Sequence, residues 1–184
     1  MRKIIVFNWI SIDGFVAGTN GETDWFAWDK EIEEQYKQVQ SSVDKIFYGR
    51  LTYETMASYW PTSAASKEDP AIRDHMNDTE KIVFSNTLKK AQWNNSRLIA
   101  QIDPEEIQRM KHLPGKNIVI YGSGSIVSAL AKLKLIDEYF LMVNPVVVGG
   151  GKPLFQMIEL KLKLINTRPF KSGVVLCHYH PEQT

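Results

Sequence analysis

The sequence holds very little cysteine, and its acidic and basic residues nearly cancel. Cys177 is the only cysteine among 184 residues, which excludes a disulfide framework and suits a reducing compartment, so we expect a cytoplasmic protein. The 22 Lys and Arg residues against 21 Asp and Glu residues give a net charge of +1. The broad positive field that attracts nucleic acids or anionic membranes is therefore missing, and we expect neither as a partner.

Long apolar runs and internal repeats are missing as well. The first apolar run ends at Asn8, too early for the core of a signal peptide, and no later run approaches the ~18 apolar residues of a membrane span. No period of about 20 to 50 residues recurs, which disfavours a solenoid or propeller. With 43% hydrophobic and 23% charged residues, the chain is expected to form a single domain over residues 1–184.

Strand and helix patterns alternate along the chain. Apolar, β-branched runs bounded by turn formers predict strands at residues 4–10, 45–48, 81–85, 117–121, 139–148, 162–167 and 173–179. Helical spacing predicts helices at 30–40, 52–59, 104–111 and after Gly124, with a capping box of Asp103 and Glu106 before the third. Residues 62–69 are expected to form a surface loop. This order predicts an α/β fold with three layers and a mixed sheet.

Two of these strands end in glycine turns that lead directly into helices, namely Gly49-Arg50-Leu51-Thr52 and Gly122-Ser123-Gly124-Ser125. Glycine lets a backbone approach a pyrophosphate, and a helix N-terminus offers unpaired N–H groups to an anion. Arg50 adds a guanidinium suited to phosphate, and Thr52 adds a hydroxyl. A tight turn that binds nothing is the alternative. The G-x-G-x-x-G fingerprint of Rossmann dehydrogenases is absent, because Val127 stands at the third glycine position.

Several other residues have two interpretations each. Ser85-Asn86 ends a third strand, where it contacts a nucleotide sugar or only turns the chain. Trp25 and Trp28 are core aromatics or one wall of a pocket for a ring. His178 and His180 share one face of a strand, but no third ligand lies nearby in the sequence, so we expect no metal site. Cys177 is expected to be a small buried apolar residue.

Taken in order, these motifs resemble the dihydrofolate reductase-like superfamily over nearly the whole chain. The matching segments are residues 5–8, the loop Ser11-Ile12-Asp13-Gly14-Phe15-Val16-Ala17-Gly18 with Asp24-Trp25, Tyr48-Gly49-Arg50-Leu51-Thr52, Val83-Phe84-Ser85-Asn86 and Ile120-Tyr121-Gly122-Ser123-Gly124-Ser125. The loop and the segment Pro145-Val146-Val147-Val148-Gly149-Gly150-Gly151 resemble most the C-terminal reductase domain of the bifunctional riboflavin-biosynthesis deaminase-reductase.

The resemblance implies a three-layer fold with a mixed, mostly parallel sheet flanked by helices and a C-terminal antiparallel strand pair. It implies a homodimer and NADPH as the hydride donor. The implied cofactor contacts are Val16 and Ala17 near the nicotinamide, Gly49, Arg50 and Thr52 on the phosphates, Ser85 and Asn86 toward the adenosine, and Gly122, Ser123, Gly124 and Ser125 under the pyrophosphate.

The resemblance also bears on the substrate, for which Asn8, Trp25, Trp28 and Lys30 are the expected contacts. Folate-reducing members carry an acid a few residues after the loop tryptophan, whereas a gapless count from Trp25 reaches Lys30, which disfavours folate reduction. The riboflavin branch reduces the ribosyl group of a phosphorylated aminouracil. Lys30, Arg73 and Lys152 are available for that phosphate, and no zinc-binding deaminase domain is expected.

Three hypotheses for function follow. The first is an NADPH-dependent oxidoreductase that transfers hydride to a C=N or C=O carbon of a small molecule, with Asp13, Asp29 or Glu33 as the proton donor. The second is a nucleotide-binding sensor or interaction protein without turnover, and the third is a folate reductase. An open, polar pocket beside Trp25 and Trp28 would favour the first hypothesis over the second.

Overall fold

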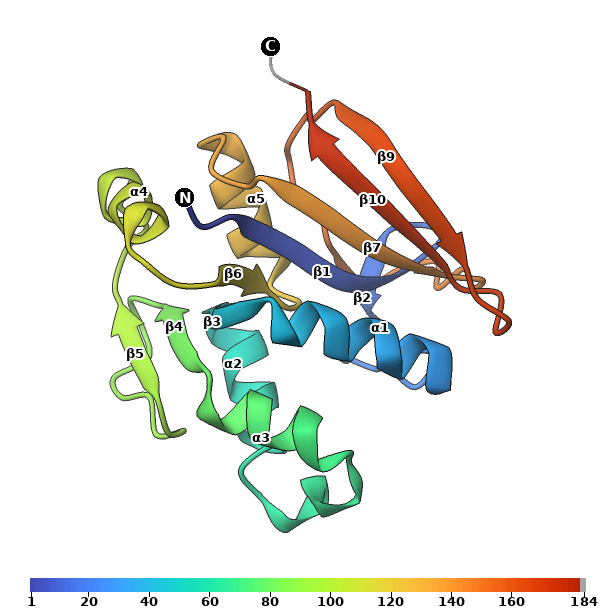
Figure 1. Ribbon diagram of the computed structural model, residues 1–184, viewed down its shortest axis with the longest axis horizontal. Coiled ribbons are helices and arrows are strands. Elements are labelled where there is room, and N and C mark those ends of the chain that lie inside the picture. Colours follow the sequence, from blue (N-terminus) through green and yellow to red (C-terminus); the bar gives the residue numbers. More distant parts are fainter. Residues whose placement is uncertain (183–184) are drawn as a thin grey trace.

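An eight-stranded sheet forms the centre of the computed structural model, which describes residues 1–182 (Figure 1). The strand order is β5-β4-β3-β6-β1-β7-β10-β9. The strands from β5 to β7 all run parallel, while β10 and β9 are antiparallel to their neighbours. Their bounds are β1 (Ile4–Ser11), β3 (Val43–Gly49), β4 (Glu80–Phe84), β5 (Ser96–Ile99), β6 (Asn117–Ile120), β7 (Glu138–Asn144), β9 (Leu162–Pro169) and β10 (Val175–Pro181). The mixed, mostly parallel sheet with its C-terminal antiparallel pair is thus confirmed.

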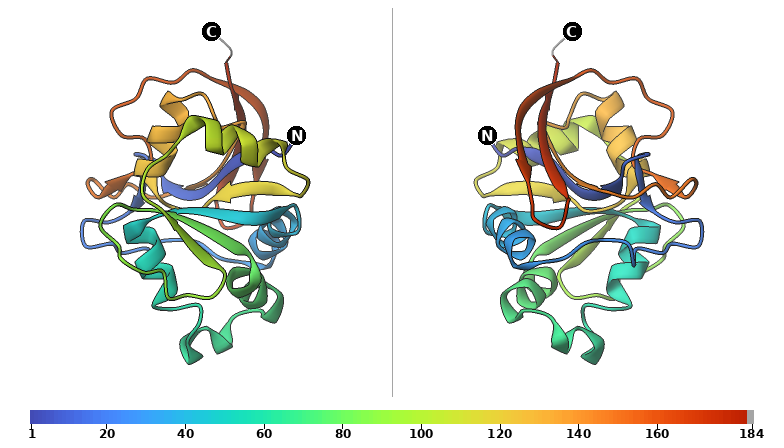
Figure 2. Two further views of the ribbon diagram at one scale, coloured as in Figure 1. Left: turned by 90° about the vertical axis from the view of Figure 1, so that its left-hand side faces the viewer. Right: turned by 90° about the vertical axis from the view of Figure 1, so that its right-hand side faces the viewer.

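Helices cover both faces of this sheet and make it a three-layer α/β fold. Figure 2 shows α1 (Lys30–Ser41) and α3 (Pro70–Asp78) on one side and α5 (Gly124–Lys132) on the other. The helix α4 (Pro104–His112) packs on the α5 side through Ile107 and Met110. The helix α2 (Arg50–Ala57) continues directly from β3.

The central strands are buried on both faces, which explains their nearly continuous apolar sequences. Along β1, Ile4 and Val6 pack toward α4 and α5, while Ile5 and Phe7 pack toward α1 and α3. All four of these side chains are at most 3% exposed. The alternation follows from the two-residue period of a strand, so β1 contributes to two separate cores.

The sequence patterns missed the shorter elements. The helix α3 was not expected, although Asp69 caps it and Pro70 occupies its first turn. Residues 62–69 hold a 3-10 helix, η1 (Ser63–Lys67), instead of an irregular loop. The strand β5 and the small antiparallel pair of β2 (Phe15–Ala17) with β8 (Lys152–Pro153) were missed as well.

One expected strand boundary is corrected. The strand β7 ends at Asn144, because Pro145 has no N–H for the ladder. Asp103 is confirmed as the N-cap of α4 and accepts a hydrogen bond from the Glu105 N–H at 2.9 Å. Glu106 pairs with Arg97 at 3.5 Å.

Membrane-spanning helices are absent from residues 1–182, where every helix is too short or too polar.

We predict that His75 in α3 makes the folded protein less stable at acidic pH. Burial, together with the charges of Lys81 and Lys116, lowers the pKa of His75 from 6.5 to about 4. Between those values the unfolded chain binds the proton and the folded chain does not, so His75 lowers stability as the pH falls from 6.5 to 4. The wild type should lose unfolding free energy between pH 6.5 and pH 4. In His75→Gln this loss should be smaller by up to about 3 kcal/mol.

Urea titrations from pH 4 to 7 measure this difference. His112→Gln, which changes an exposed histidine of α4, is the control and should keep the wild-type slope. Parallel stability curves for wild type and His75→Gln would contradict the burial effect.

Candidate functional site

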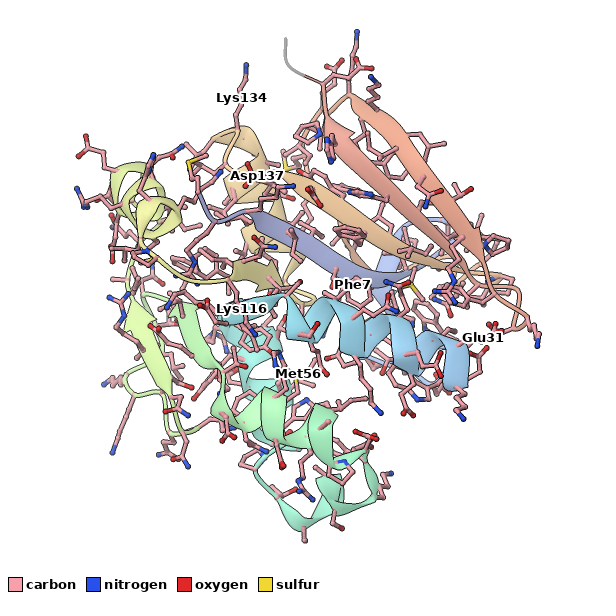
Figure 3. The ribbon with its side chains drawn as sticks, in the orientation of Figure 1. Phe7, Glu31, Met56, Lys116, Lys134 and Asp137 are labelled. Carbon is pink, nitrogen blue, oxygen red and sulfur yellow. The ribbon has the colours of Figure 1, made fainter. Side chains whose placement is uncertain are left out.

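A cleft of about 360 Å³ lies at the carboxyl ends of β1, β6 and β3. In open α/β sheets, ligands bind in the crevice outside these strand ends. Figure 3 labels one residue on each of two walls, Phe7 of β1 and Met56 of α2. The cleft is also lined by Asn8, Trp9, Val16, Ala17, Phe26, Trp28, Tyr36, Leu51, Thr52, Thr55, Tyr59, Glu68, Tyr121, Gly122, Ser123 and Lys152.

Aromatic side chains form one wall of the cleft. The Trp9 ring is stacked against Trp28 at 5.7 Å and against Phe26 at 6.0 Å, measured between ring centroids. Tyr36 meets the edge of Trp9 at 5.6 Å and that of Trp28 at 5.7 Å. Trp28 is 48% exposed and so offers ring surface at the rim. Such a wall suits a flat heterocyclic ligand.

Two buried polar atoms of cleft residues have no hydrogen-bond partner. They are the indole Nε1 of Trp9 and the hydroxyl of Tyr121. Burial raises the pKa of Tyr121 well above its ordinary value, so its hydroxyl keeps its proton and can donate. Buried donors are rarely left unsatisfied, and each costs about 1–3 kcal/mol. Both atoms lie beneath the surface of the cleft, and the Tyr121 hydroxyl interacts with that of Tyr36.

The turn between β6 and α5 is held from three sides. The Asn8 side-chain oxygen accepts a hydrogen bond from the Gly122 N–H. The Asn8 side-chain NH₂ group donates one to the Gly122 carbonyl oxygen at 3.3 Å. The Thr52 hydroxyl accepts the Ser123 N–H at 3.1 Å, and the Ser123 hydroxyl accepts the Gly49 N–H at 3.0 Å. These contacts fix the two glycine turns to each other and to β1, so the floor of the cleft is rigid.

The helices that start at these turns differ from the others in their caps. Asp29, Asp69 and Asp103 place a carboxylate on the first N–H groups of α1, α3 and α4. Gly49 and Ser123, which precede α2 and α5, make no side-chain cap, and neither helix has an acid in its first turn. The positive ends of α2 and α5 are thus left for an anionic ligand.

The expected cofactor residues fall into two groups. Val16, Ala17, Thr52, Gly122 and Ser123 line the cleft. Gly49, Arg50, Ser85, Asn86, Gly124 and Ser125 lie outside it, at the ends of the adjacent strands β3, β4 and β6.

Two side chains of the outer group have partners within the protein. Arg50 pairs with Glu54 at 2.8 Å while remaining partly exposed. The Ser85 hydroxyl accepts the N–H groups of Thr87 and Leu88 at 3.2 and 2.9 Å. Asn86 and Ser125 are exposed.

The expected substrate residues are only partly brought together. Asn8 and Trp28 line the cleft, and so does Lys152, one of the cations suggested for a phosphate. Trp25 lines a neighbouring hollow of about 460 Å³ with residues 148–150 instead. Lys30 is exposed at the start of α1 and lines neither space.

The three expected proton donors do not line the cleft, which corrects the sequence-based interpretation. Asp13 is exposed and accepts the N–H groups of Val148 and Gly149, at 3.1 and 2.8 Å. Its hydrogen bond with Ser11, aided by these two, lowers the pKa of Asp13. Asp29 caps α1, and Glu33 pairs with Lys37 at 2.8 Å. Each carboxylate is used to hold the backbone or a helix surface.

Glu68, just after η1, is the acidic residue among those that line the cleft in residues 1–182. The Tyr59 hydroxyl donates a hydrogen bond to it, and that bond raises the pKa of Tyr59 to about 12. Tyr59 follows Thr52, Thr55 and Met56 on one face of α2 and the turn after it, and all four line the cleft. That spacing was a signal in the sequence, whereas nothing there marked Glu68.

The model of the RibD C-terminal domain family matches residues 2–176. The chain belongs to this family. The family is that of the reductase domain of RibD, within the dihydrofolate reductase-like superfamily, so the resemblance in the sequence is confirmed.

Known relatives agree with this assignment. The uncharacterized protein YyaP of Bacillus subtilis (strain 168) is 35% identical over 181 residues, which are 97% of this chain and 95% of YyaP. The crystal structure of a protein from Shewanella sp. PV-4 assigned to riboflavin biosynthesis is similar with a TM-score of 0.79 and 22% identity, over 98% of this chain and 99% of that one. Dihydrofolate reductase of Enterococcus faecalis, solved with NADP(H) and RAB-propyl, gives 0.64 and 14%, over 98% and 97%. The two solved structures support the fold.

The packing of α5 against residues 153–154 generates a prediction for Gly124. A Cβ there would lie 2.3 Å from the Pro153 carbonyl oxygen and 2.9 Å from that of Leu154. Backbone atoms cannot move aside cheaply, so Gly124→Ala should lower the unfolding free energy by about 1–3 kcal/mol. Gly150→Ala is the matched control, because its nearest neighbour would be 3.9 Å away. Equal denaturation midpoints for the two variants would contradict the close approach.

Proposed function

We propose that the protein is an NADPH-dependent reductase of the riboflavin-biosynthesis type, acting on 5-amino-6-(5-phosphoribosylamino)uracil or a small molecule of similar chemistry. The observation that carries the proposal is the pair of uncapped helix N-termini, of α2 and α5, beside a cleft with an aromatic wall. Family membership supports reductase chemistry, and the NADP(H) in the Enterococcus faecalis dihydrofolate reductase structure supports the cofactor.

The strand ends support an extended position for the dinucleotide. The strands β4, β3, β6 and β1 are successive neighbours, about 4.8 Å apart. A dinucleotide crossing their ends would have its adenosine near Ser85, its phosphates on the turns at Gly49 and Gly122, and its nicotinamide near Val16. Gly122 and Gly124 lack a Cβ where Thr52 and the carbonyls of residues 153–154 lie close, so they let the turn at the start of α5 pack tightly beside the cleft. NADPH would supply the hydride when bound, and the protein supplies position and electrostatics.

The cleft supports binding of a planar, polar substrate. A pyrimidine ring can stack on the exposed surface of Trp28. Lys152 is suited to a substrate phosphate. Glu68, held by Tyr59, would bind hydroxyls of a ribosyl group and take part in moving the proton that balances hydride transfer. In this proposal the substrate ring lies at Trp28 and the ribosyl group lies at Glu68.

The open cleft favours a reductase over a sensor without turnover. A binding module that had lost its reaction would be expected to fill the substrate side with its own side chains. The space beside Trp28 is open instead, with Thr52, Glu68 and Lys152 among the residues that line the cleft. Cytoplasmic location and a homodimer belong to the same proposal, and the edge strand β9 with its exposed Leu164 and Ile165 is a surface suited to pairing of subunits.

Cofactor binding is tested by calorimetric titration with NADPH and with NADH. We expect tighter binding of NADPH, and about tenfold weaker binding in Arg50→Ala, because a charge-assisted hydrogen bond to phosphate contributes about 1.5–3 kcal/mol. Arg109→Ala, which removes an exposed arginine of α4, should bind as the wild type does. If neither nucleotide binds, the cofactor assignment is wrong and the interaction-protein hypothesis gains support.

The role of Glu68 is tested by the kinetics of aminouracil-dependent NADPH oxidation. Glu68→Gln and Tyr59→Phe should each lower kcat/KM about tenfold to a hundredfold while the dissociation constant of NADPH stays unchanged. Glu105→Gln, on the exposed surface of α4, is the control. Wild-type kcat/KM in Glu68→Gln would remove this carboxylate from the mechanism.

A further inference from the structure

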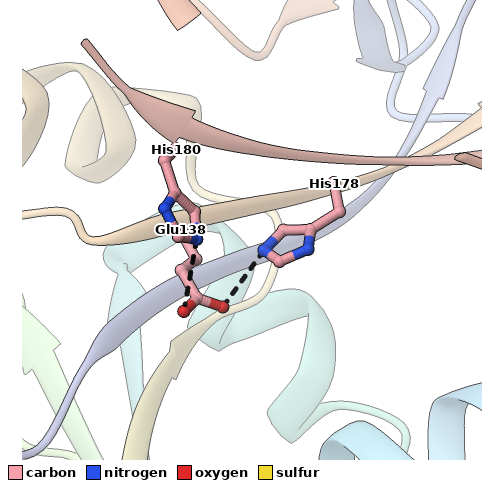
Figure 4. A group of neighbouring side chains, drawn as sticks. All are labelled: Glu138, His178 and His180. Atoms are coloured by element: carbon pink, nitrogen blue, oxygen red, sulfur yellow. Dashed lines mark ion pairs between the residues drawn. The ribbon is translucent and has the colours of Figure 1, made fainter. Parts of the chain in front are cut away.

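Outside the cleft, β10 brings two histidines to a carboxylate of β7. Nε2 of His178 lies 3.2 Å from Oε2 of Glu138, and Nε2 of His180 lies 3.6 Å from Oε1. The three ligand atoms lie within 4.8 Å of one another. Figure 4 shows both rings directed from β10 at the one carboxylate. The third ligand that is missing near the histidines in the sequence is therefore supplied by the neighbouring strand.

The cluster is fixed at its base and open on one side. The side chains of Glu138 and His178 are 10% and 19% exposed, whereas that of His180 is 44% exposed. Phe140 stacks on His178 with centroids 4.1 Å apart and holds the ring in place. A hollow of about 200 Å³, lined by Glu138, Phe140 and Gln35 among others, adjoins the carboxylate. Ligand exchange from solvent is therefore sterically allowed.

One atom of the cluster is left unsatisfied. Nε2 of His178 is buried, and its 3.2 Å approach to Glu138 does not form a directed hydrogen bond. Buried nitrogen atoms normally have a partner, so this atom needs an explanation. A metal ion bound between the three side chains would accept the lone pair of this nitrogen.

We propose that Glu138, His178 and His180 form a binding site for Zn²⁺ or a similar first-row transition metal ion. Two imidazole nitrogens and one carboxylate oxygen are a donor set that suits Zn²⁺, with a fourth position left for water. The imidazoles exclude Mg²⁺ and Ca²⁺, which prefer oxygen ligands. Glu138 begins β7, at the end of the parallel strands opposite the cleft, so the site is separate from the proposed reaction and would link β10 to β7.

Lys3 is the competitor for this site. Its ammonium group contacts Glu138, and its side chain is 54% exposed, so it can swing into solvent when a cation binds. Loss of this charge should favour the metal, because like charges around one carboxylate repel each other. Cys177, which directly precedes His178, is expected on the opposite face of the strand and cannot join them.

The experiment is a Zn²⁺ titration of the tag-free protein against a chromophoric chelator. The wild type should bind one Zn²⁺ per chain, His178→Ala and His180→Ala should each bind at least about tenfold more weakly, and Lys3→Met should bind several-fold more tightly. His112→Ala, which removes an exposed histidine of α4, and Cys177→Ser should leave the affinity unchanged. Mg²⁺ in place of Zn²⁺ should not bind.

A thermal measurement keeps the proposal testable if a variant is destabilised. His180 is the more exposed histidine and packs less than His178, so His180→Ala should fold, which circular dichroism checks. A hundredfold excess of Zn²⁺ over its Kd should raise the Tm of the wild type by about 5 °C and leave that of His180→Ala unchanged. Wild-type affinity in a His178→Ala, His180→Ala double variant, or equal weakening by His112→Ala, would overturn the assignment.

Discussion

The double contact between Asn8 and Gly122 is the interaction on which the site depends. Asn8 stands on the central strand β1, and Gly122 follows the neighbouring strand β6, so one amide side chain ties the turn to the sheet. Thr52 and Ser123 extend the connection to the start of α2. Because donors and acceptors of the turn are used up in this way, its backbone has one arrangement, and the two helix N-termini keep a fixed separation.

Holding the turn in this arrangement requires an unfavourable backbone conformation, which the surrounding contacts stabilise. Ser123 has a φ of 56°, which is a left-handed conformation that an L-residue seldom adopts. Gly124 must lie against the Pro153 carbonyl, where no larger residue fits. Strain of this kind persists where neighbouring contacts determine the conformation, and it is concentrated at sites that bind ligands. The conformation of the turn is thus fixed by its contacts with Asn8, Thr52 and residues 153–154.

The two faces of the sheet form the hydrophobic cores, whereas its two ends carry the polar clusters. Both faces of β1 are buried under helices, so stability comes from the middle of the sheet. The carboxyl ends hold the cleft. The amino end of β7 holds Glu138, where the antiparallel strand β10 adds its histidines. A parallel sheet with one antiparallel extension can therefore carry two unrelated sites, because the added strand runs back past the end that the cleft does not use.

From the sequence alone, the mixed, mostly parallel sheet and the glycine turns before two of its helices could be predicted. Apolar runs bounded by glycine turns located the central strands, and the turns at Gly49 and Gly122 marked the uncapped helices, because these features depend on local backbone geometry. Which side chains meet depends on how the elements pack in three dimensions. This packing moved Asp13, Asp29 and Glu33 away from the cleft and brought in Tyr59 and Glu68, and it placed Glu138 beside two histidines some 40 residues later in the chain. Contacts of this kind are set by strand order and helix placement, which a local pattern does not encode.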